Sequence, residues 1–79
     1  MVSVSKIMVD VDLGRKGIEK TEMYVYLDGK LIETHFDRCY DDIKVVVANL
    51  RDRYKDALVE VACEGEDFFG RIHRWPLEI

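Results

Sequence analysis

The dipeptide Asp28-Gly29 separates two segments in which apolar and polar residues alternate, and it constrains the fold more than any other feature of the sequence. In this setting Asp-Gly is the strongest short-range signal for a β-hairpin, because both central residues of a type I′ turn have positive φ. A two-residue turn also fixes which residues lie opposite each other, and it predicts that Val25 faces Ile32. The hairpin then has one apolar face and one face that is rich in tyrosine.

Alternation with period two, which is typical of strands with one buried face, recurs along the chain. The alternating segments are residues 2–13, 21–28, 30–36, 57–64 and 68–75. A tight turn over residues 64–67 is expected to join the last two segments. Residues 13–20 contain two glycines and four charges and are expected to form a loop. The strand residues predicted to be buried are Ile7, Val9, Val11, Met23, Val25, Ile32, Phe36, Val59, Val61, Phe68 and Ile72.

Residues 40–56 show helical spacing instead, with Ile43, Val47, Leu50 and Tyr54 on one stripe. Apolar residues at these intervals are typical of an amphipathic helix, here of about four turns. Acidic residues begin the segment and basic residues end it, which suits the helix dipole. A single helix can cover only one face of a sheet, so the opposite face, which we call the open face, is expected to lack a covering element.

The order of these elements, βββαββ, predicts a single small α+β domain over residues 1–79, since a chain of this length has room for one domain. We expect a five-stranded, mostly antiparallel sheet with the strand order 3-2-1-4-5 and the helix packed on one face. The arrangement of its first four strands resembles the core of the RNase H-like fold, which also occurs in truncated form in HicB-type antitoxins. The resemblance is one of topology, because the sequence contains neither a HicB signature nor a full set of nuclease motifs.

The charge balance argues against nucleic acid as a partner. The chain has 12 basic and 16 acidic residues and a net charge of −4, and it lacks a basic stripe that would neutralise phosphates. No stretch reaches the ~20 apolar residues that a membrane span requires. Residues 1–11 lack the features of a signal peptide, and Cys39 and Cys63 are expected to be reduced thiols. We therefore expect a cytoplasmic protein, in the host cell if the protein is viral.

A group of carboxylates on the open face is the sharpest candidate for metal chemistry. Asp10 and Asp12 on the first strand and Glu60 and Glu64 on the fourth are expected on neighbouring parallel strands. Such a group could hold Mg²⁺, which prefers oxygen ligands, and nucleases of the RNase H type place acids on these two strands. The alternative is a solvated strand face in which Glu60 pairs with Arg71. The acids also lack a basic channel that would guide a nucleic-acid substrate to them.

The histidines and cysteines match no zinc-binding spacing such as CxxC or HxxxH. His35 is expected to pair with Glu22 across the hairpin, and Cys63 and His73 are expected on opposite faces. We therefore assign no catalytic, cofactor-binding or metal-binding residue.

The open face is the strongest candidate for a binding surface, because several aromatic side chains fall on it and charged residues surround them. The residues predicted to form this interface are Met8, Tyr24, Tyr26, Leu31, Leu58, Phe69 and Trp75. The partner would be another protein or a second copy of the chain, in a homodimer.

Two functions remain open on this evidence. The first is a small, acidic, non-enzymatic cytosolic protein that acts by protein–protein interaction through its open sheet face or sheet edge, like the adaptors and inhibitors of phages and mobile elements. The second is a remnant of a metal-dependent RNase H-like nuclease that uses the carboxylate group.

Overall fold

The computed structural model describes residues 4–13, 21–38 and 40–79. The expected loop at residues 14–20 and the state of Cys39 lie outside these residues. The strands and the helix are β1 (Lys6–Asp12), β2 (Thr21–Leu27), β3 (Lys30–Arg38), α1 (Tyr40–Arg53), β4 (Leu58–Glu66) and β5 (Ile72–Pro76).

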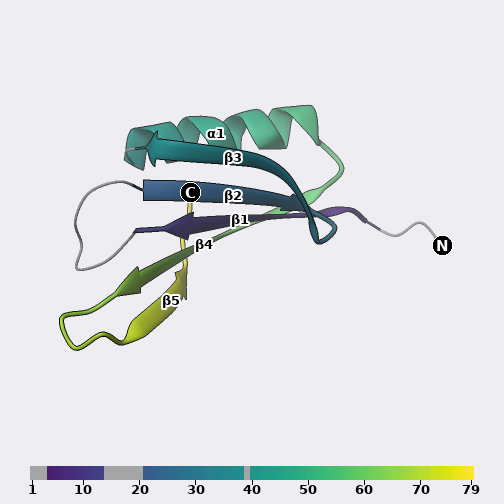
Figure 1. Cartoon of the computed structure of the whole chain (residues 1–79). Coiled ribbons are helices and arrows are strands. Elements are labelled where there is room, and N and C mark those ends of the chain that lie inside the picture. Colours follow the sequence, from purple (N-terminus) through teal and green to yellow (C-terminus); the bar gives the residue numbers. More distant parts are fainter. Residues whose placement is uncertain (1–3, 14–20, 39) are drawn as a thin grey trace.

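The strands form one sheet in the order β3-β2-β1-β4-β5, and α1 lies on one face of it (Figure 1). β1 and β4 are parallel, whereas the other neighbouring strands are antiparallel. Parallel neighbours need a long crossover connection, and the segment that contains α1 carries the chain from the β3 edge back to a place beside β1. The predicted α+β class, strand order and single helix are confirmed.

The core lies between α1 and the middle of the sheet. Buried residues recur at every second position of β1, β2 and β4, because successive side chains of a strand point to opposite faces. The buried hydrophobic residues are Ile7, Val9, Val11, Met23, Val25, Ile43, Val47, Leu50, Val61 and Cys63. In α1, acidic residues occupy the first turn and basic residues the last, as the sequence predicts.

The turn between β2 and β3 is the predicted one, with φ of 49° at Asp28 and 86° at Gly29. The expected pairing of Tyr26 with Leu31 is present. The next residue of β2, Val25, lies opposite Glu33 instead of Ile32. The predicted pairing of Val25 with Ile32 is therefore wrong.

The cause is a β-bulge, in which two residues of one strand oppose a single residue of its partner. Ile32 stays against the core as the extra residue, so Glu33 and His35 turn toward the face that carries α1. Phe36 is 56% exposed, which corrects its predicted burial, and a second register shift lies beside it between the pairings of Met23 with His35 and of Thr21 with Arg38.

The β4–β5 hairpin also differs from the prediction, because its turn lies at residues 67–71 and not at 64–67. Glu66 pairs with Ile72, and Cys63 pairs with Trp75. Phe68 falls in the turn and is 87% exposed, and Ile72 is 68% exposed, so the prediction that both are buried is wrong. In Figure 1 this hairpin projects from the sheet on the side away from α1.

The chain ends beside the helix. Pro76, which cannot donate a hydrogen bond to a strand, ends β5 as predicted. The Leu77 amide then donates to the Val61 carbonyl at 2.9 Å, and Arg51 of α1 donates to the Ile79 carbonyl at 2.7 Å. Leu77 and Ile79 pack against the core.

Candidate protein-binding surface

The open face begins with three side chains that β1 and β2 place side by side. Met8 lies opposite Tyr26, and Asp10 lies opposite Tyr24. Met8, Tyr24 and Tyr26 are each partly exposed, and α1 is on the other side of the sheet. Directly opposed residues of antiparallel strands share a face and contact each other, so these side chains form one continuous surface.

β3 extends this surface. Leu31 is 48% exposed and lies opposite Tyr26, and Thr34 lies opposite Tyr24. Phe36, two residues further along β3, is 56% exposed, and we count it with this surface. The sequence pattern missed its exposure because strict alternation does not continue past the bulge at Ile32. We call the group Tyr24, Tyr26, Leu31 and Phe36 the aromatic half of the open face.

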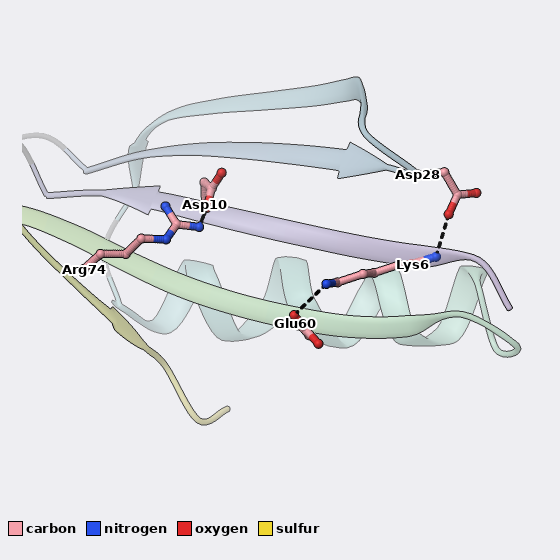
Figure 2. Close-up of polar contacts among 5 residues, drawn as sticks. All are labelled: Lys6, Asp10, Asp28, Glu60 and Arg74. Atoms are coloured by element: carbon pink, nitrogen blue, oxygen red, sulfur yellow. Dashed lines mark hydrogen bonds and ion pairs between the residues drawn. The ribbon is translucent and has the colours of Figure 1, made fainter.

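The other half of the open face, over β1 and β4, carries paired charges. Figure 2 shows Arg74 reaching from β5 across β4 to Asp10 on β1, with its Nη2 atom 2.5 Å from Oδ1. The figure also shows the Lys6 ammonium 3.1 Å from the Glu60 carboxylate. All four side chains are partly exposed, and ion pairs of this kind contribute at most about 1 kcal/mol each to stability.

Tyr24 links the aromatic half to the acidic end of β2. Its hydroxyl donates to Oε2 of Glu22 at 2.5 Å, and this hydrogen bond raises the pKa of Tyr24 above its usual value. The neutral form of the tyrosine is therefore favoured, and its hydroxyl is directed along the strand to Glu22.

The carboxylates that were candidates for binding Mg²⁺ do not converge on one metal site. Asp10 is engaged by Arg74 and Glu60 by Lys6, whereas the sequence predicted Arg71 as the partner of Glu60. Within the described part of the chain, no three His, Cys, Asp or Glu side chains come close enough to hold one metal ion. A metal ion bound by Asp10 and Glu60 would have to displace Arg74 from the first and Lys6 from the second.

The histidines make local contacts instead of a shared site. His35 Nε2 lies 3.2 Å from Glu33, on the helix side of the sheet, so the predicted pairing with Glu22 is wrong. His73 Nε2 lies 2.8 Å from Asp67, in the β4–β5 hairpin. Cys63 is a free thiol in the core, and burial raises its pKa.

Glu33 forms the main charged contact between the sheet and the helix end. Its partial burial would raise its pKa, but the hydrogen bonds from Arg53 at 2.7 Å and from His35 outweigh this effect. The net pKa of Glu33 is lowered, so the carboxylate stays charged at the edge of the core.

Three of the predicted interface residues lie outside the aromatic half. Leu58 begins β4 on the open face and is 55% exposed. Phe69 lies in the β4–β5 turn, so its expected pairing with Ala62 on the open face is wrong. Trp75 pairs with Cys63. Its ring lies against Gly65, so close that a Cβ atom on residue 65 would be 3.5 Å from the ring. Its expected place on the open face is therefore also wrong, because Cys63 faces the helix side.

No protein-family model matches the chain, and neither a curated protein nor a solved structure matches it. Among the residues that the structure describes, no helix combines the length and the apolar character needed to cross a membrane.

Proposed function

We propose that the protein acts without catalysis, in the cytoplasm, by binding another protein through the aromatic half of its open face. One observation supports the proposal: Tyr24, Tyr26 and Leu31 lie next to one another, partly exposed, on the side of the sheet that α1 leaves uncovered, and the exposed Phe36 follows on β3. A free buried thiol at Cys63 is compatible with a reducing compartment.

The composition of this surface suits a protein partner. Tyrosine is enriched in the centres of protein interfaces, because its ring gives a large apolar contact and its hydroxyl can still hydrogen-bond. Glu22 and Asp28 lie at the two ends of β2 and leave the surface with an acidic border. The complementary partner therefore presents an apolar patch with basic residues around it.

The paired charges on the other half of the open face argue for docking over metal-dependent chemistry. Asp10 and Glu60 each neutralise a basic side chain from this chain, in contacts that require no further ligand. A nuclease site needs carboxylates that are available to metal ions and a basic path for the substrate. Among the described residues no three His, Cys, Asp or Glu side chains are grouped so that they could hold a metal ion.

The test is a double substitution, Tyr26→Ser with Leu31→Ser, and its control is Val45→Ser. Val45 is 67% exposed on α1, so it matches the others in being an exposed apolar residue on a different face. The wild type and both variants are immobilised, partners are captured from the source cell and identified, and the dissociation constant of each is measured.

Each buried side chain of this size contributes about 1.5–3 kcal/mol, so the double variant should weaken the partner's affinity by about 100-fold or more. The Val45→Ser variant should bind like the wild type. All three proteins should melt cooperatively, because none of the changed residues belongs to the core. Equal affinity for the double variant and the wild type would refute the proposal.

A further inference from the structure

The turn of the β4–β5 hairpin, residues 67–71, is built by one aspartate. The Asp67 Oδ1 atom accepts hydrogen bonds from the Phe69 and Arg71 amides, both at 2.9 Å. The Asp67 amide donates to the Arg71 carbonyl at 2.9 Å, and the Gly70 amide donates to the Asp67 carbonyl at 3.1 Å. Gly70 supplies the positive φ, 78°, that the turn needs.

This ordered turn displays two phenylalanines. Phe68 is 87% exposed and Phe69 is 88% exposed, the highest values among the large hydrophobic residues that the structure describes. Neither packs against the core. A rigid turn loses little conformational entropy when it binds, so an aromatic pair presented in this way is a preorganised anchor. We call residues 67–71 the tip.

The same chain contains a groove of a size to receive such an anchor. β5 pairs with β4 only from Ala62 onward and ends at Pro76, where the C-terminal residues turn toward α1. A groove of about 800 Å³ remains along the first half of β4. It is lined by residues 59–62 of β4, by residues 74–79, and by Met8 and Arg51. This volume is within the range of pockets that enclose molecules larger than two phenyl rings.

We propose that the tip of one copy inserts Phe68 and Phe69 into the β4-edge groove of a second copy, and that the second copy does the same in return. The tip lies about seven residues beyond Val61 along the hairpin, or about 23 Å at the rise of a strand. A two-fold axis midway between tip and groove satisfies both insertions at once. β5 is the end strand of the sheet, so its outer edge has no neighbour within the sheet and can face the β5 edge of the second copy.

The area favours reciprocal insertion over a single one. A buried phenylalanine removes roughly 150–250 Å² from solvent. The two rings of one tip and the groove wall that they cover account for roughly 600–1,000 Å², which is the size of a crystal-packing contact or a weak complex. Two such insertions reach roughly 1,200–2,000 Å², the size of a stable protein interface.

Charge favours a second copy over a lipid bilayer as the occupant. The two acids Glu66 and Asp67 outnumber Arg71, so the segment around the phenylalanines has a net negative charge that anionic lipids of a membrane surface would repel. The groove contains two arginines and two glutamates, so its formal charge is zero and it does not repel the tip. The dimer leaves the aromatic half of the open face free, so this inference and the proposed function can fail separately.

The test is sedimentation equilibrium of the purified full chain over a range of concentrations. The wild type should dimerise, and Phe68→Ser with Phe69→Ser should weaken the dimer by at least 100-fold. The variant should melt as the wild type monomer does, since both rings are exposed. The Val45→Ser control, exposed on α1, should dimerise like the wild type.

A photo-crosslinking analogue, p-benzoylphenylalanine, in place of Phe69 locates the contact. A mixture of isotope-labelled and unlabelled chains should give crosslinks between copies, from the tip to residues 59–62 or 74–79. A wild type that stays monomeric overturns the inference, as does a dimer that survives loss of both phenylalanines. A dimer that is lost only with Tyr26→Ser and Leu31→Ser assigns self-association to the open face instead. Binding to phosphatidylcholine–phosphatidylglycerol vesicles that depends on Phe68 and Phe69, in a monomeric protein, assigns the tip to lipid.

Discussion

Truncation of Leu50 to alanine tests the packing on which the whole fold depends. Leu50 lies in the last half of α1 with no exposed surface, in the cluster that α1 forms with β1, β2 and β4. Replacing a fully buried leucine with alanine removes its transfer free energy and leaves a cavity, at a cost of about 2.7–5 kcal/mol. Domains of this size have a total stability of about 4–12 kcal/mol, at 0.05–0.15 kcal/mol per residue. The Leu50→Ala variant should therefore lose about a fifth or more of the free energy of unfolding.

Urea denaturation at 25 °C, followed by circular dichroism, measures this loss directly. The midpoint should fall while the slope with denaturant stays constant, because the surface exposed on unfolding hardly changes. The melting temperature should fall by at least ~10 °C, since 1 kcal/mol corresponds to about 4–8 °C in a domain this small. Val45→Ala is the matched control: Val45 is 67% exposed on the same helix, and its replacement should change stability by no more than about 0.5 kcal/mol.

A Leu50→Ala variant that is as stable as Val45→Ala would refute the packing of α1 on the sheet through this stripe. The stronger change Leu50→Asp should prevent folding, because it would bury a charge that has no partner. A Leu50→Asp protein with a cooperative melting transition like that of the parent would lead to the same conclusion.

Three further predictions concern the metal site, the thiol and the tip. The melting temperature should not change on addition of Mg²⁺ or Mn²⁺, because Asp10 and Glu60 are engaged by basic side chains; a rise that saturates with metal would contradict this. Cys63 should react with a thiol reagent only on unfolding, because burial shields it and raises its pKa; rapid reaction of the folded protein would contradict this, and a Cys63→Ala variant identifies its signal. The hydrogen bond from His73 and those from two backbone amides lower the pKa of Asp67. The charged carboxylate therefore stabilises the tip above the ordinary value of about 4, and this contribution is lost as the pH falls through the lowered pKa. The NMR shift of the Phe69 amide should follow this titration and should lose it in Asp67→Asn; a midpoint at or above the ordinary value would contradict the assignment.

The part of the fold under the helix could be predicted from the sequence because its pattern is unambiguous there. On β1 and β4 a shift of one residue would turn valines and isoleucine out of the core and carboxylates into it. Such a penalty fixes the register of a strand with one buried face. The spacing of Ile43, Val47 and Leu50 fixes the face of α1 in the same way, and all three are buried.

The bulge in β3 could not be predicted, because its compensation comes from a distant part of the chain. Alternation from the turn makes Ile32 and Phe36 inward residues and Glu33 an outward one. The structure turns Glu33 toward the helix side, where Arg53, which is 20 residues further along the chain, lies 2.7 Å from it. A local pattern contains no information about that partner. Its consequence is the exposure of Phe36, which enlarges the aromatic half of the open face.

The register of β4 with β5 failed for a different reason. Every residue of β5 is exposed, so no burial penalty distinguishes one register from the next. Side-chain hydrogen bonds decide it instead: Asp67 accepts from two amides of the turn, and this fixes the turn three residues later than the alternation suggests. The two phenylalanines that resemble the start of a strand in the sequence are thereby placed in the turn.

Both failures occur at the two edge strands of the sheet, β3 and β5, and the two proposed contact surfaces lie on or beside these strands. β5 is the end strand of the sheet on the side away from α1 (Figure 1). Ordering each backbone residue of such a segment costs about 1–2 kcal/mol in conformational entropy. The β4–β5 hairpin recovers little of this cost from the core, because Phe68, Phe69 and Ile72 remain exposed. Its hydrogen bonds hold its shape, and the proposed insertion into a second copy would bury Phe68 and Phe69. A partner that binds only the ordered form of the hairpin stabilises that form by mass action. A hairpin that is well ordered but weakly buried is therefore what we expect of an element that inserts into a second copy.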